Sequence, residues 1–303
     1  MSEPLVSVVV LSYDRPALLA RALDSIVAQG YANVETIVVD NRSPRSEEVA
    51  ALVGAYDGVR LIRNGANLGF TGGMNRGIEA ARGLYLYCTN DDMLLARDCV
   101  ERFVEYAESH PSAGLLTGVM YSEGGGRVVC AGGEFALSPV YRRTNHGEGE
   151  PDASRFARPF NVTCVDGAML FGRLALVKRL GGFREDFFMY VDSTELSARV
   201  LKAGYEIAVV PGAAAYAVDA GREGAERAAN FHRVKNLFAF YLLHARARVL
   251  PEFFVRYGVV RPLRSAASDP RFLRETLRAW GWLLARAPAL LRERRRWAGR
   301  AAA

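Results

Sequence analysis

The chain has 303 residues, half of them hydrophobic, which is enough for one large domain or two modest ones with a sizeable core. Its net charge of +6 comes almost wholly from arginine, since only Lys178, Lys202 and Lys235 are lysines. The sequence contains no run of about 18 uncharged apolar residues and no basic N-terminal region, so we expect neither a transmembrane helix nor a secretory signal.

Strand and helix patterns alternate in the first half of the chain. Residues 6–11 are a continuous β-branched and leucine run, typical of a strand buried on both faces. By the same kind of pattern we predict further strands at 35–39, 59–63 and 84–88, and helices at 16–28 and 71–81. Alternation of this kind predicts an α/β fold with a mostly parallel sheet and right-handed crossovers.

The pattern changes in the second half of the chain. Glycine clusters break residues 123–150, and the polar stretch 145–154 is expected to be a mobile loop. Beyond it we predict a strand at 162–171, a helix at 173–180, an aromatic turn at 183–189, a helix at 193–203 that ends at Gly204, a strand at 207–210 stopped by Pro211, and helix from 225 onward. The organisation we predict is an α/β domain at 1–224, with halves 1–122 and 123–224, and a basic helical region at 225–303.

Acidic residues follow two of the predicted strands directly. Asp40 could accept a hydrogen bond from the imide N–H of uracil or thymine, although Asp is also common as a cap of a turn. Asp91 and Asp92 follow a later strand, where adjacent carboxylates suit Mg²⁺ or Mn²⁺; a helix or turn cap is the alternative. Ligands of open α/β sheets bind at the carboxyl ends of the strands, so these residues indicate a nucleotide and cation site.

A glycine-rich loop lies between those two acidic segments. Residues 67–77 contain several glycines around a predicted helix start, which could offer free N–H groups to a phosphate. The spacing fits neither a Walker A loop nor a dinucleotide-binding fingerprint. A tight turn packed on the sheet is the alternative interpretation.

Together these segments resemble the family 2 inverting glycosyltransferases with a GT-A fold, in particular the bacterial rhamnosyltransferase-like branch. The resemblance covers about residues 6–212 and is carried by segments 8–15, 40–41, 67–75, 90–92, 165–169 and 181–188. It implies transfer of a sugar from a nucleoside diphosphate sugar, dTDP- or UDP-linked rather than GDP-linked, with Mg²⁺ or Mn²⁺ as cofactor. The implied acceptor is a hydroxyl of a lipid-linked saccharide, a polysaccharide or a small natural product.

Position by position, the resemblance also implies roles for individual residues. Those expected at the nucleotide are Ser12, Tyr13, Arg15, Asp40, Asn67, Gly69, Gly73, Asn75 and Asp91. Asp92 would be the main metal ligand, and the segment Asp166, Gly167 and Ala168 would form the floor of the donor-sugar and acceptor pocket.

The sequence departs from the family pattern in two places. Ser193 stands where the family has the Asp that acts as the base, so either Asp192 or Glu195 takes that role, with Asp192 preferred, or the base is lost. No histidine follows the strand that ends near Pro211, and Asp219 is the available substitute as a metal ligand. A catalytically impaired, nucleotide-binding partner protein is therefore the alternative to an active enzyme. A third interpretation, a sugar nucleotidyltransferase, would need an N-terminal phosphate loop that ends in lysine, which this chain lacks.

The C-terminal region mixes arginine with leucine and tryptophan. That composition suits an interfacial helix on an anionic membrane, and an ordinary helix packed on the catalytic domain or on a second copy of the chain is the alternative. No nucleic-acid-binding signature is present, so we expect no nucleic acid partner. The four cysteines lack metal or disulfide spacing, which favours a cytoplasmic protein, peripheral on the inner face of the membrane if it binds one.

Overall fold

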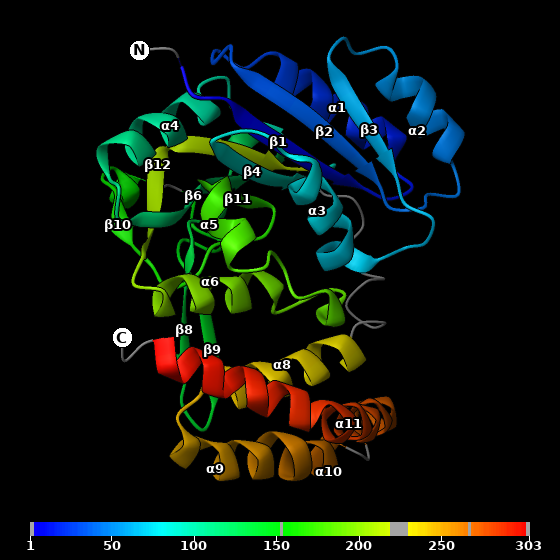
Figure 1. Cartoon of the computed structure of the whole chain (residues 1–303), viewed down its shortest axis with the longest axis vertical. Coiled ribbons are helices and arrows are strands. Elements are labelled where there is room, and N and C mark those ends of the chain that lie inside the picture. The colour runs from blue at the N-terminus through cyan, green and yellow to red at the C-terminus, as the bar shows by residue number, and fades with distance from the viewer. Residues whose placement is uncertain (1–2, 152–153, 219–229, 266–267, 301–303) are drawn as a thin grey trace.

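The computed structural model describes residues 3–151, 154–218, 230–265 and 268–300, and every structural statement below refers to these residues (Figure 1). One large sheet organises the first two-thirds of the chain, with strand order β10-β12-β6-β11-β4-β1-β2-β3, while β5 pairs with β12 and β7 pairs with β6. The strands of this sheet are β1 (Val6–Ser12), β2 (Val34–Asp40), β3 (Val59–Arg63), β4 (Tyr85–Asn90), β5 (Met93–Leu95), β6 (Ala113–Ser122), β7 (Val128–Cys130), β10 (Phe160–Asn161), β11 (Met169–Arg173) and β12 (Glu206–Ala217).

Helices cover the sheet and form most of the C-terminal part. They are α1 (Pro16–Val27), α2 (Ser46–Val53), α3 (Gly69–Ala80), α4 (Cys99–Ser109), α5 (Leu174–Arg179), α6 (Asp192–Lys202), α8 (Asn230–His244), α9 (Leu250–Val255), α10 (Arg261–Ser265) and α11 (Pro270–Arg300). Short 3-10 turns stand at η1 (Glu123–Gly125), η2 (Ser154–Phe156), η3 (Glu185–Phe187) and η5 (Ala247–Val249), and a π-helical turn, η6 (Arg256–Val260), joins α9 to α10.

The strand pairing explains why the first half of the sequence is predictable. β1 pairs in parallel with both β2 and β4, and β2 pairs in parallel with β3, so β1 is fully buried and needs apolar side chains on both faces. Pro16 begins α1, at a position where the missing N–H leaves no helical hydrogen bond unmade. The apolar side of this helix packs Leu19 and Leu23 onto the sheet.

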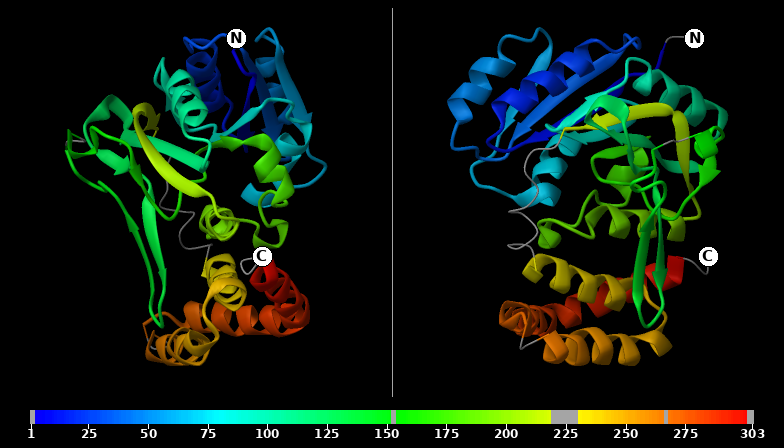
Figure 2. Two further views of the ribbon diagram at one scale, coloured as in Figure 1. Left: turned by 60° about the vertical axis from the view of Figure 1, so that its left-hand side comes forward. Right: turned by 180° about the vertical axis from the view of Figure 1, so that it is seen from behind.

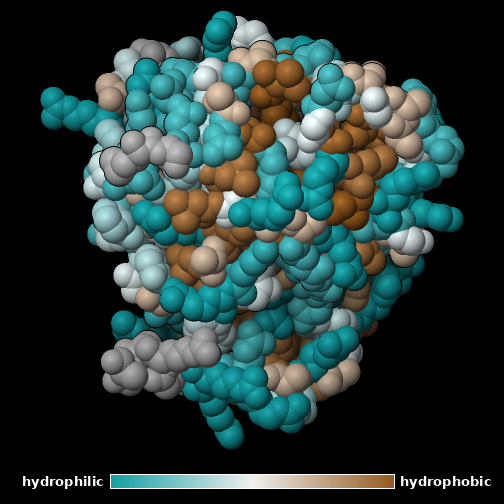
Figure 3. All heavy atoms as spheres, turned by 45° about the horizontal axis from the view of Figure 1, so that its top comes forward, coloured by the Kyte–Doolittle hydropathy of each residue, from teal (hydrophilic) through white to brown (hydrophobic). Residues whose placement is uncertain are grey.

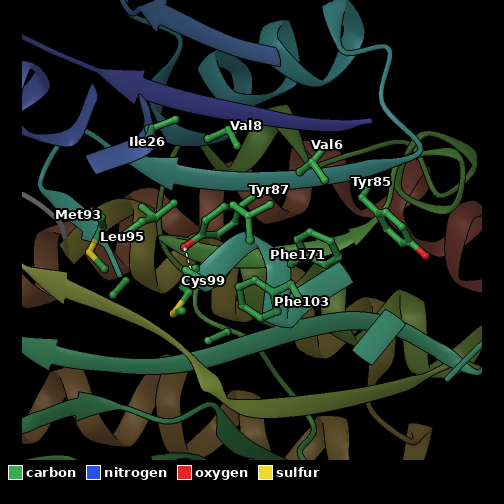
Figure 4. Close-up of a cluster of buried hydrophobic side chains, with 14 of the residues drawn as sticks. Val6, Val8, Ile26, Tyr85, Tyr87, Met93, Leu95, Cys99, Phe103 and Phe171 are labelled. Carbon is green, nitrogen blue, oxygen red and sulfur yellow. Dashed lines mark hydrogen bonds between the residues drawn. The ribbon is translucent and has the colours of Figure 1, made fainter. Parts of the chain in front are cut away.

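One face of the sheet is packed around aromatic side chains. Figure 4 shows Tyr87, Phe103 and Phe171 together in this cluster. The rings of Phe103 and Phe171 stack with centroids 4.9 Å apart, which joins α4 to β11. The antiparallel strand β11 thus lies between β4 and β6 and ties the two parallel parts of the sheet into one core.

Two predicted strands differ from those observed. The sequence predicts that β12 stops at Pro211, but it continues to Ala217, because its pairing with β6 shifts register between Val209 and Ala214. Inside that bulge Pro211 needs no N–H for the ladder. Gly118 of β6 makes the bulge feasible, since a Cβ there would lie 1.9 Å from the carbonyl oxygen of Ala213.

The strand expected over residues 162–171 is interrupted. Only its last part is in β11, and it is preceded by a turn in which the Ala168 N–H donates to Oδ1 of Asp166 at 3.0 Å. The side chain of Asp166 thus competes with the sheet for backbone hydrogen bonds, which a hydrophobicity pattern does not register.

A hairpin and the C-terminal helices form a second body beneath the sheet. Figure 2 shows the two-stranded sheet of β8 (Gly133–Leu137) and β9 (Tyr141–Asn145) reaching toward α9. The hydroxyl of Tyr241 donates to the Ser138 carbonyl at 2.7 Å, and that of Tyr257 to the Tyr141 carbonyl at 3.3 Å. Aromatic side chains such as Phe238, with its ring 5.0 Å from that of Trp280, fill the space between the helices.

The outer surface is mostly polar on the face shown in Figure 3, and the thiols are buried. The face drawn in Figure 3 is mostly hydrophilic, with hydrophobic side chains gathered in several places. All four cysteines, Cys88, Cys99, Cys130 and Cys164, are free and buried. Burial raises the pKa of Cys99 to about 12 and those of the other three thiols above the usual value, so none is ionised at neutral pH. No helix in the described part of the chain is long and apolar enough to cross a membrane.

Candidate functional site

The acidic segments singled out in the sequence meet at one edge of the sheet. Ser12 at the end of β1 pairs with Asp40 at the end of β2, and Leu11 pairs with Asn90 at the end of β4. β11 runs antiparallel to β4 with Met169 opposite Thr89, so the turn before Met169 lies beside the residues that follow β4. Four adjacent strands, β11, β4, β1 and β2, therefore present their polar ends along the same edge.

Arg15 connects the two carboxylates that follow β4. Its guanidinium forms an ion pair with Asp91, and its Nη1 lies 3.0 Å from Oδ2 of Asp92. The backbone N–H of Tyr13 donates to the other oxygen of Asp91 at 3.2 Å, and the Tyr13 side chain is exposed. Burial raises the pKa of Asp91 to about 6 although Arg15 opposes that shift, whereas the side chain of Asp92 is 19% exposed. Asp92 is thus the carboxylate that faces outward.

Asp40 is buried and holds the loop that follows β2. Its Oδ1 accepts the Ser43 N–H at 2.9 Å, and its Oδ2 accepts the hydroxyl of Ser46 at the start of α2. Asp40 is fully buried, and both of its carboxylate oxygens accept hydrogen bonds from within the chain.

The glycine-rich loop is held mainly by contacts within the chain. Asn67 accepts hydrogen bonds from Asn41 and from the N–H of Gly69, at 3.0 and 2.9 Å. Gly69 has a φ of +70°, and a Cβ there would lie 2.3 Å from the carbonyl oxygen of Phe188. A Cβ on Gly73 would lie 2.5 Å from Leu11. The loop therefore lies too close to Phe188 and Leu11 to accept a side chain at Gly69 or Gly73.

Asn75 fastens α3 to the segment that leads toward α6. Its amide nitrogen donates to the Phe183 carbonyl, and its oxygen accepts the Phe183 N–H, each at 2.8 Å. A Cβ on Gly182 would lie 2.5 Å from the same amide oxygen. Asn75 therefore holds a turn, and its side-chain hydrogen bonds are directed at that turn and not at the sheet edge.

Asp192 begins α6 and faces the turn before β11. A Cβ on Gly167 would lie 3.7 Å from Oδ1 of Asp192, and the same oxygen accepts the Ser193 N–H at 2.6 Å. Burial, supported by the nearby charge of Asp166, raises the pKa of Asp192 to about 6. A carboxyl that is 8% exposed and titrates close to neutrality, beside a turn at the sheet edge, has the properties of a general base.

The segment before Asp192 has a strained backbone. Phe188, Tyr190 and Val191 all have positive φ, an arrangement that costs on the order of 1–3 kcal/mol per residue. Asn236 of α8 compensates by donating to the carbonyls of Phe187, Met189 and Tyr190 at 3.0, 2.7 and 2.8 Å. The N–H of Thr71 donates to the Phe188 carbonyl at 3.1 Å from the other side. The direction of Asp192 is therefore set jointly by α3 and α8.

Glu195, the other candidate base, lies in a different environment. It is fully buried, and its carboxylate forms hydrogen bonds with Arg199 at 2.7 to 3.1 Å and lies 3.0 Å from Nε2 of His244. Burial favours the neutral form, but Arg199 and His244 outweigh it and hold the pKa of Glu195 well below its usual range. A buried carboxylate paired in this way is a structural group.

The sheet edge offers oxygen ligands that suit a divalent cation. No group of three or more His, Cys, Asp and Glu side chains among residues 3–151, 154–218, 230–265 and 268–300 could hold a metal by itself. Mg²⁺ usually takes one or two carboxylates and completes its shell with water and phosphate oxygens, so Asp92 beside Asp91 fits a cation shared with a diphosphate. Asp219 lies outside the described residues. Val218, just before it, donates its N–H to the Asp92 carbonyl at 2.8 Å.

Several residues near this edge make contacts that the sequence did not predict. Arg143 on β9 has Nη2 3.6 Å from Oδ2 of Asp166, and Phe70 contacts both Gly167 and Phe183. Asn41 organises the glycine-rich loop by accepting from Asn64 and the Leu68 N–H at 3.0 Å each. These roles depend on contacts between distant segments.

Several known proteins have sequences similar to this chain. The family described as Glycosyl transferase family 2 matches residues 7–173. An N-acetylglucosaminyl-diphospho-decaprenol L-rhamnosyltransferase from Mycobacterium tuberculosis is 26% identical over 258 residues, which are 76% of this chain and 82% of that protein. The succinoglycan biosynthesis protein ExoO of Rhizobium meliloti is 36% identical over 108 residues, 35% of this chain and 30% of its own length.

Solved structures are similar in fold at low sequence identity. One is GalNAc-T7 with UDP, GalNAc and Mn²⁺, with a TM-score of 0.66 and 14% identity over 93% of this chain, which spans 57% of that chain. The mannosyltransferase PcManGT from Pyrobaculum calidifontis, in complex with GDP-Man and Mn²⁺, has a TM-score of 0.57 and 19% identity over 100% of this chain and 85% of its own. These likenesses confirm the expected GT-A fold, with its mostly parallel sheet flanked by helices and its helical C-terminal region.

Proposed function

Since the chain belongs to glycosyltransferase family 2, we propose that it moves one sugar from a dTDP- or UDP-linked donor to an acceptor hydroxyl by a single displacement that inverts the anomeric centre. The observation that carries this proposal is the alignment of Asp40, Asp91, Asp92 and the Asp166–Ala168 turn along one sheet edge, with Asp192 facing that turn. A nucleotide at β1, β2 and β4 would direct its sugar toward β11 and α6.

The reaction needs one base and one stabiliser of the leaving group. Asp192 takes the proton of the acceptor hydroxyl as its oxygen attacks the anomeric carbon, and the bond from that carbon to the diphosphate breaks with its electron pair remaining on the diphosphate. We assign this role to Asp192 and not to Glu195, whose carboxylate is already paired with Arg199. Asp92, with Asp91 and Arg15 behind it, would hold Mg²⁺ or Mn²⁺ at the diphosphate, where a cation supplies neutralising charge.

The remaining contacts follow from the positions of the side chains. The exposed ring of Tyr13 is available to the base or ribose, and Ser12 and Asp40 would line the same pocket. Asn67, Gly69, Gly73 and Asn75 would shape that pocket indirectly, through the loop contacts described above.

We further propose that three parts of the chain have different roles. Residues 1–122 would hold the nucleotide, residues 123–224 would hold the acceptor and carry the base, and residues 225–303 would face the membrane. The rhamnosyltransferase relative is named for a diphospho-decaprenol acceptor, which supports a lipid-linked saccharide over a polysaccharide or a small natural product, and a cytoplasmic enzyme at the membrane surface. A homodimer would be compatible with this arrangement.

Thermal stabilisation by nucleotides tests the proposal directly. A ligand that binds only the folded state raises the melting temperature, so dTDP or UDP with Mn²⁺ should do so, and EDTA should remove most of the effect. Asp92→Ala should lose the metal-dependent part, whereas Arg82→Ala, at an exposed arginine near the opposite end of β4, should keep it. No shift with dTDP, UDP or GDP at millimolar concentration would contradict the proposal.

Turnover distinguishes an active enzyme from the alternative, a catalytically impaired partner protein. Hydrolysis or transfer from the stabilising sugar nucleotide that disappears in Asp192→Asn would exclude a catalytically impaired protein.

A further inference from the structure

A second cavity, of about 670 Å³, lies between the β8–β9 hairpin and the C-terminal helices. Arginines from three separate elements line it, namely Arg142 and Arg143 of β9, Arg233 of α8 and Arg261 of α10 (Figure 1 gives these elements). Within the described part of the chain, no carboxylate lies within ion-pair distance of Arg142, Arg233 or Arg261. Asp269 also lines the cavity, but its Oδ1 accepts the Phe272 N–H at the start of α11.

The charge of this cavity is therefore positive, because its four arginines outnumber the carboxylates of Asp166 and Asp269. Arg143 is partly balanced by Asp166, at 3.6 Å, and the other three guanidinium groups lack such a partner among the described residues. Like charges brought together from different elements repel one another, and an anion between them relieves that repulsion. The planar fork of donors on each arginine matches the oxygens of a phosphate.

The floor of the same cavity is apolar. Val234 and Leu237 of α8 and the rings of Tyr257 and Phe272 contribute to it. The guanidinium of Arg261 lies over both rings, at 5.2 and 5.4 Å from their centroids, which keeps it directed along the apolar wall. A ligand that satisfies both parts carries phosphate and an apolar chain.

The cavity also adjoins the proposed reaction site. Val191, which lines it, directly precedes Asp192, and Arg143 reaches from it to Asp166 in the turn that Asp192 faces. A phosphate held by the arginines would thus place the group attached to it within reach of the base.

We propose that this cavity binds the phosphate groups of an acceptor substrate whose sugar hydroxyl is presented to Asp192 and whose apolar chain lies along Tyr257 and Phe272. The inference deepens the proposed function and rests on it. It assigns acceptor recognition to arginines of β9, α8 and α10, two of which lie outside the region that the family match covers.

Calorimetric titration of the full chain with farnesyl diphosphate tests this assignment. Farnesyl diphosphate should bind, whereas farnesol, which lacks the phosphates, and inorganic pyrophosphate, which lacks the chain, should each bind at least tenfold more weakly. Arg233→Ala and Arg261→Ala should each weaken binding by about 10- to 100-fold, the loss expected for a hydrogen bond to a charged group. Arg248→Ala, at an arginine of the same region outside the cavity, is the matched control and should bind normally.

Donor binding distinguishes the two levels of the proposal. Each variant should keep the thermal shift with dTDP or UDP, which also demonstrates that it is folded. A wild-type chain that binds nucleotide but not farnesyl diphosphate would overturn the cavity assignment alone, whereas loss of both would overturn the proposed function.

Two further results would also overturn the assignment. Pyrophosphate binding as tight as that of farnesyl diphosphate would indicate a site for free phosphate. Binding to phosphatidylglycerol vesicles that Arg233→Ala abolishes, while farnesyl diphosphate binding stays unchanged, would indicate that these arginines contact lipid headgroups.

Discussion

Asp192 and Glu195 both lie in the first turn of α6, yet their surroundings shift their acidities in opposite directions. Burial, with the nearby charge of Asp166, raises the pKa of Asp192 to about 6, whereas Arg199 and His244 lower that of Glu195. A general base must bind and release a proton in each catalytic cycle, whereas a carboxylate in a structural ion pair must stay ionised. In the function proposed above, Asp192 therefore serves catalysis and Glu195 serves stability.

Replacing Asp192 by Asn should remove activity while it increases stability. Turnover should fall by about 10²- to 10⁴-fold, the usual contribution of a general base. In the wild type, the rate should rise with pH through about 6 and then level off, because the base must be deprotonated. A pH–rate profile of both proteins is the measurement, and wild-type turnover in the variant would contradict the assignment.

The stability of the same variant follows from linkage. Because the folded state raises the pKa of Asp192, stability falls as pH rises from the unfolded value of 3.8 through about 6. A neutral amide at this position removes that loss, so Asp192→Asn should be more stable by up to about 3 kcal/mol above pH 6 and equal to wild type well below pH 4. Urea unfolding across this pH range would detect the difference.

Replacing Glu195 by Gln should have the opposite effect on stability. The change leaves the Arg199 guanidinium buried without its counter-charge, which typically costs about 3–5 kcal/mol. Because the pKa of Glu195 is lowered, its contribution is present above the unfolded value of 4.5 and declines at lower pH, so the deficit of the variant should shrink in acid. A deficit that does not depend on pH would contradict the ion-pair explanation.

Helix α8 supports the candidate site from outside the α/β part. Asn236 and Lys235 together donate to the backbone of residues 186–190, while the Thr71 N–H donates to the Phe188 carbonyl from the other side. Helix α8 therefore helps to fix the position of the start of α6.

Asn236→Ala should weaken catalysis more than donor binding. It removes three hydrogen bonds to the strained segment, so kcat should fall at least tenfold through misplacement of Asp192, with the nucleotide Kd within about twofold of wild type. Steady-state kinetics with nucleotide titration separates the two. Asn33→Ala, at an exposed site whose amide donates to the Glu3 carbonyl, is the control. Equal losses in kcat and nucleotide affinity would indicate general unfolding instead.

Elements with local patterns could be predicted from the sequence, and those set by distant contacts could not. The strand at 59–63 and the helix from Pro16 were predicted closely, because a short run of strand-forming residues and a proline-initiated helix depend on neighbouring residues. The continuation of β12 past Pro211 depends on Gly118 across the sheet. In the same way, Asp92 was visible as a strand-end carboxylate, whereas the contacts of Asn75, Asn236 and Arg143 arise only when remote segments meet.

Exposed leucines gather on the C-terminal helices. Leu277, Leu284 and Leu291 recur every seven residues along α11, with Leu277 62% and Leu284 68% exposed, and arginines lie between them. Leu263 of α10 is 60% exposed. Apolar side chains among arginines suit an anionic membrane surface, which supports peripheral binding at the end of the molecule opposite β1 to β3.

Glutamates in place of the exposed leucines of α11 should weaken membrane binding. The double change Leu277→Glu and Leu284→Glu removes apolar contact and adds repulsion from anionic lipid, so co-sedimentation with phosphatidylglycerol vesicles should fall at least tenfold. Val27→Glu, at a residue of α1 that is 61% exposed, places the same kind of charge on the sheet part and should have no effect. Equal sedimentation of all three proteins would exclude membrane contact through α11.

The burial of all four thiols makes the chain a convenient substrate for site-directed labelling. Cys88, Cys99, Cys130 and Cys164 are shielded from reagents and held protonated, so a maleimide dye should react slowly with the native protein. A cysteine introduced at an exposed position such as 277 would then be labelled selectively without removal of any native one. Fluorescence from that single dye could follow the approach of the helical end to a vesicle in real time.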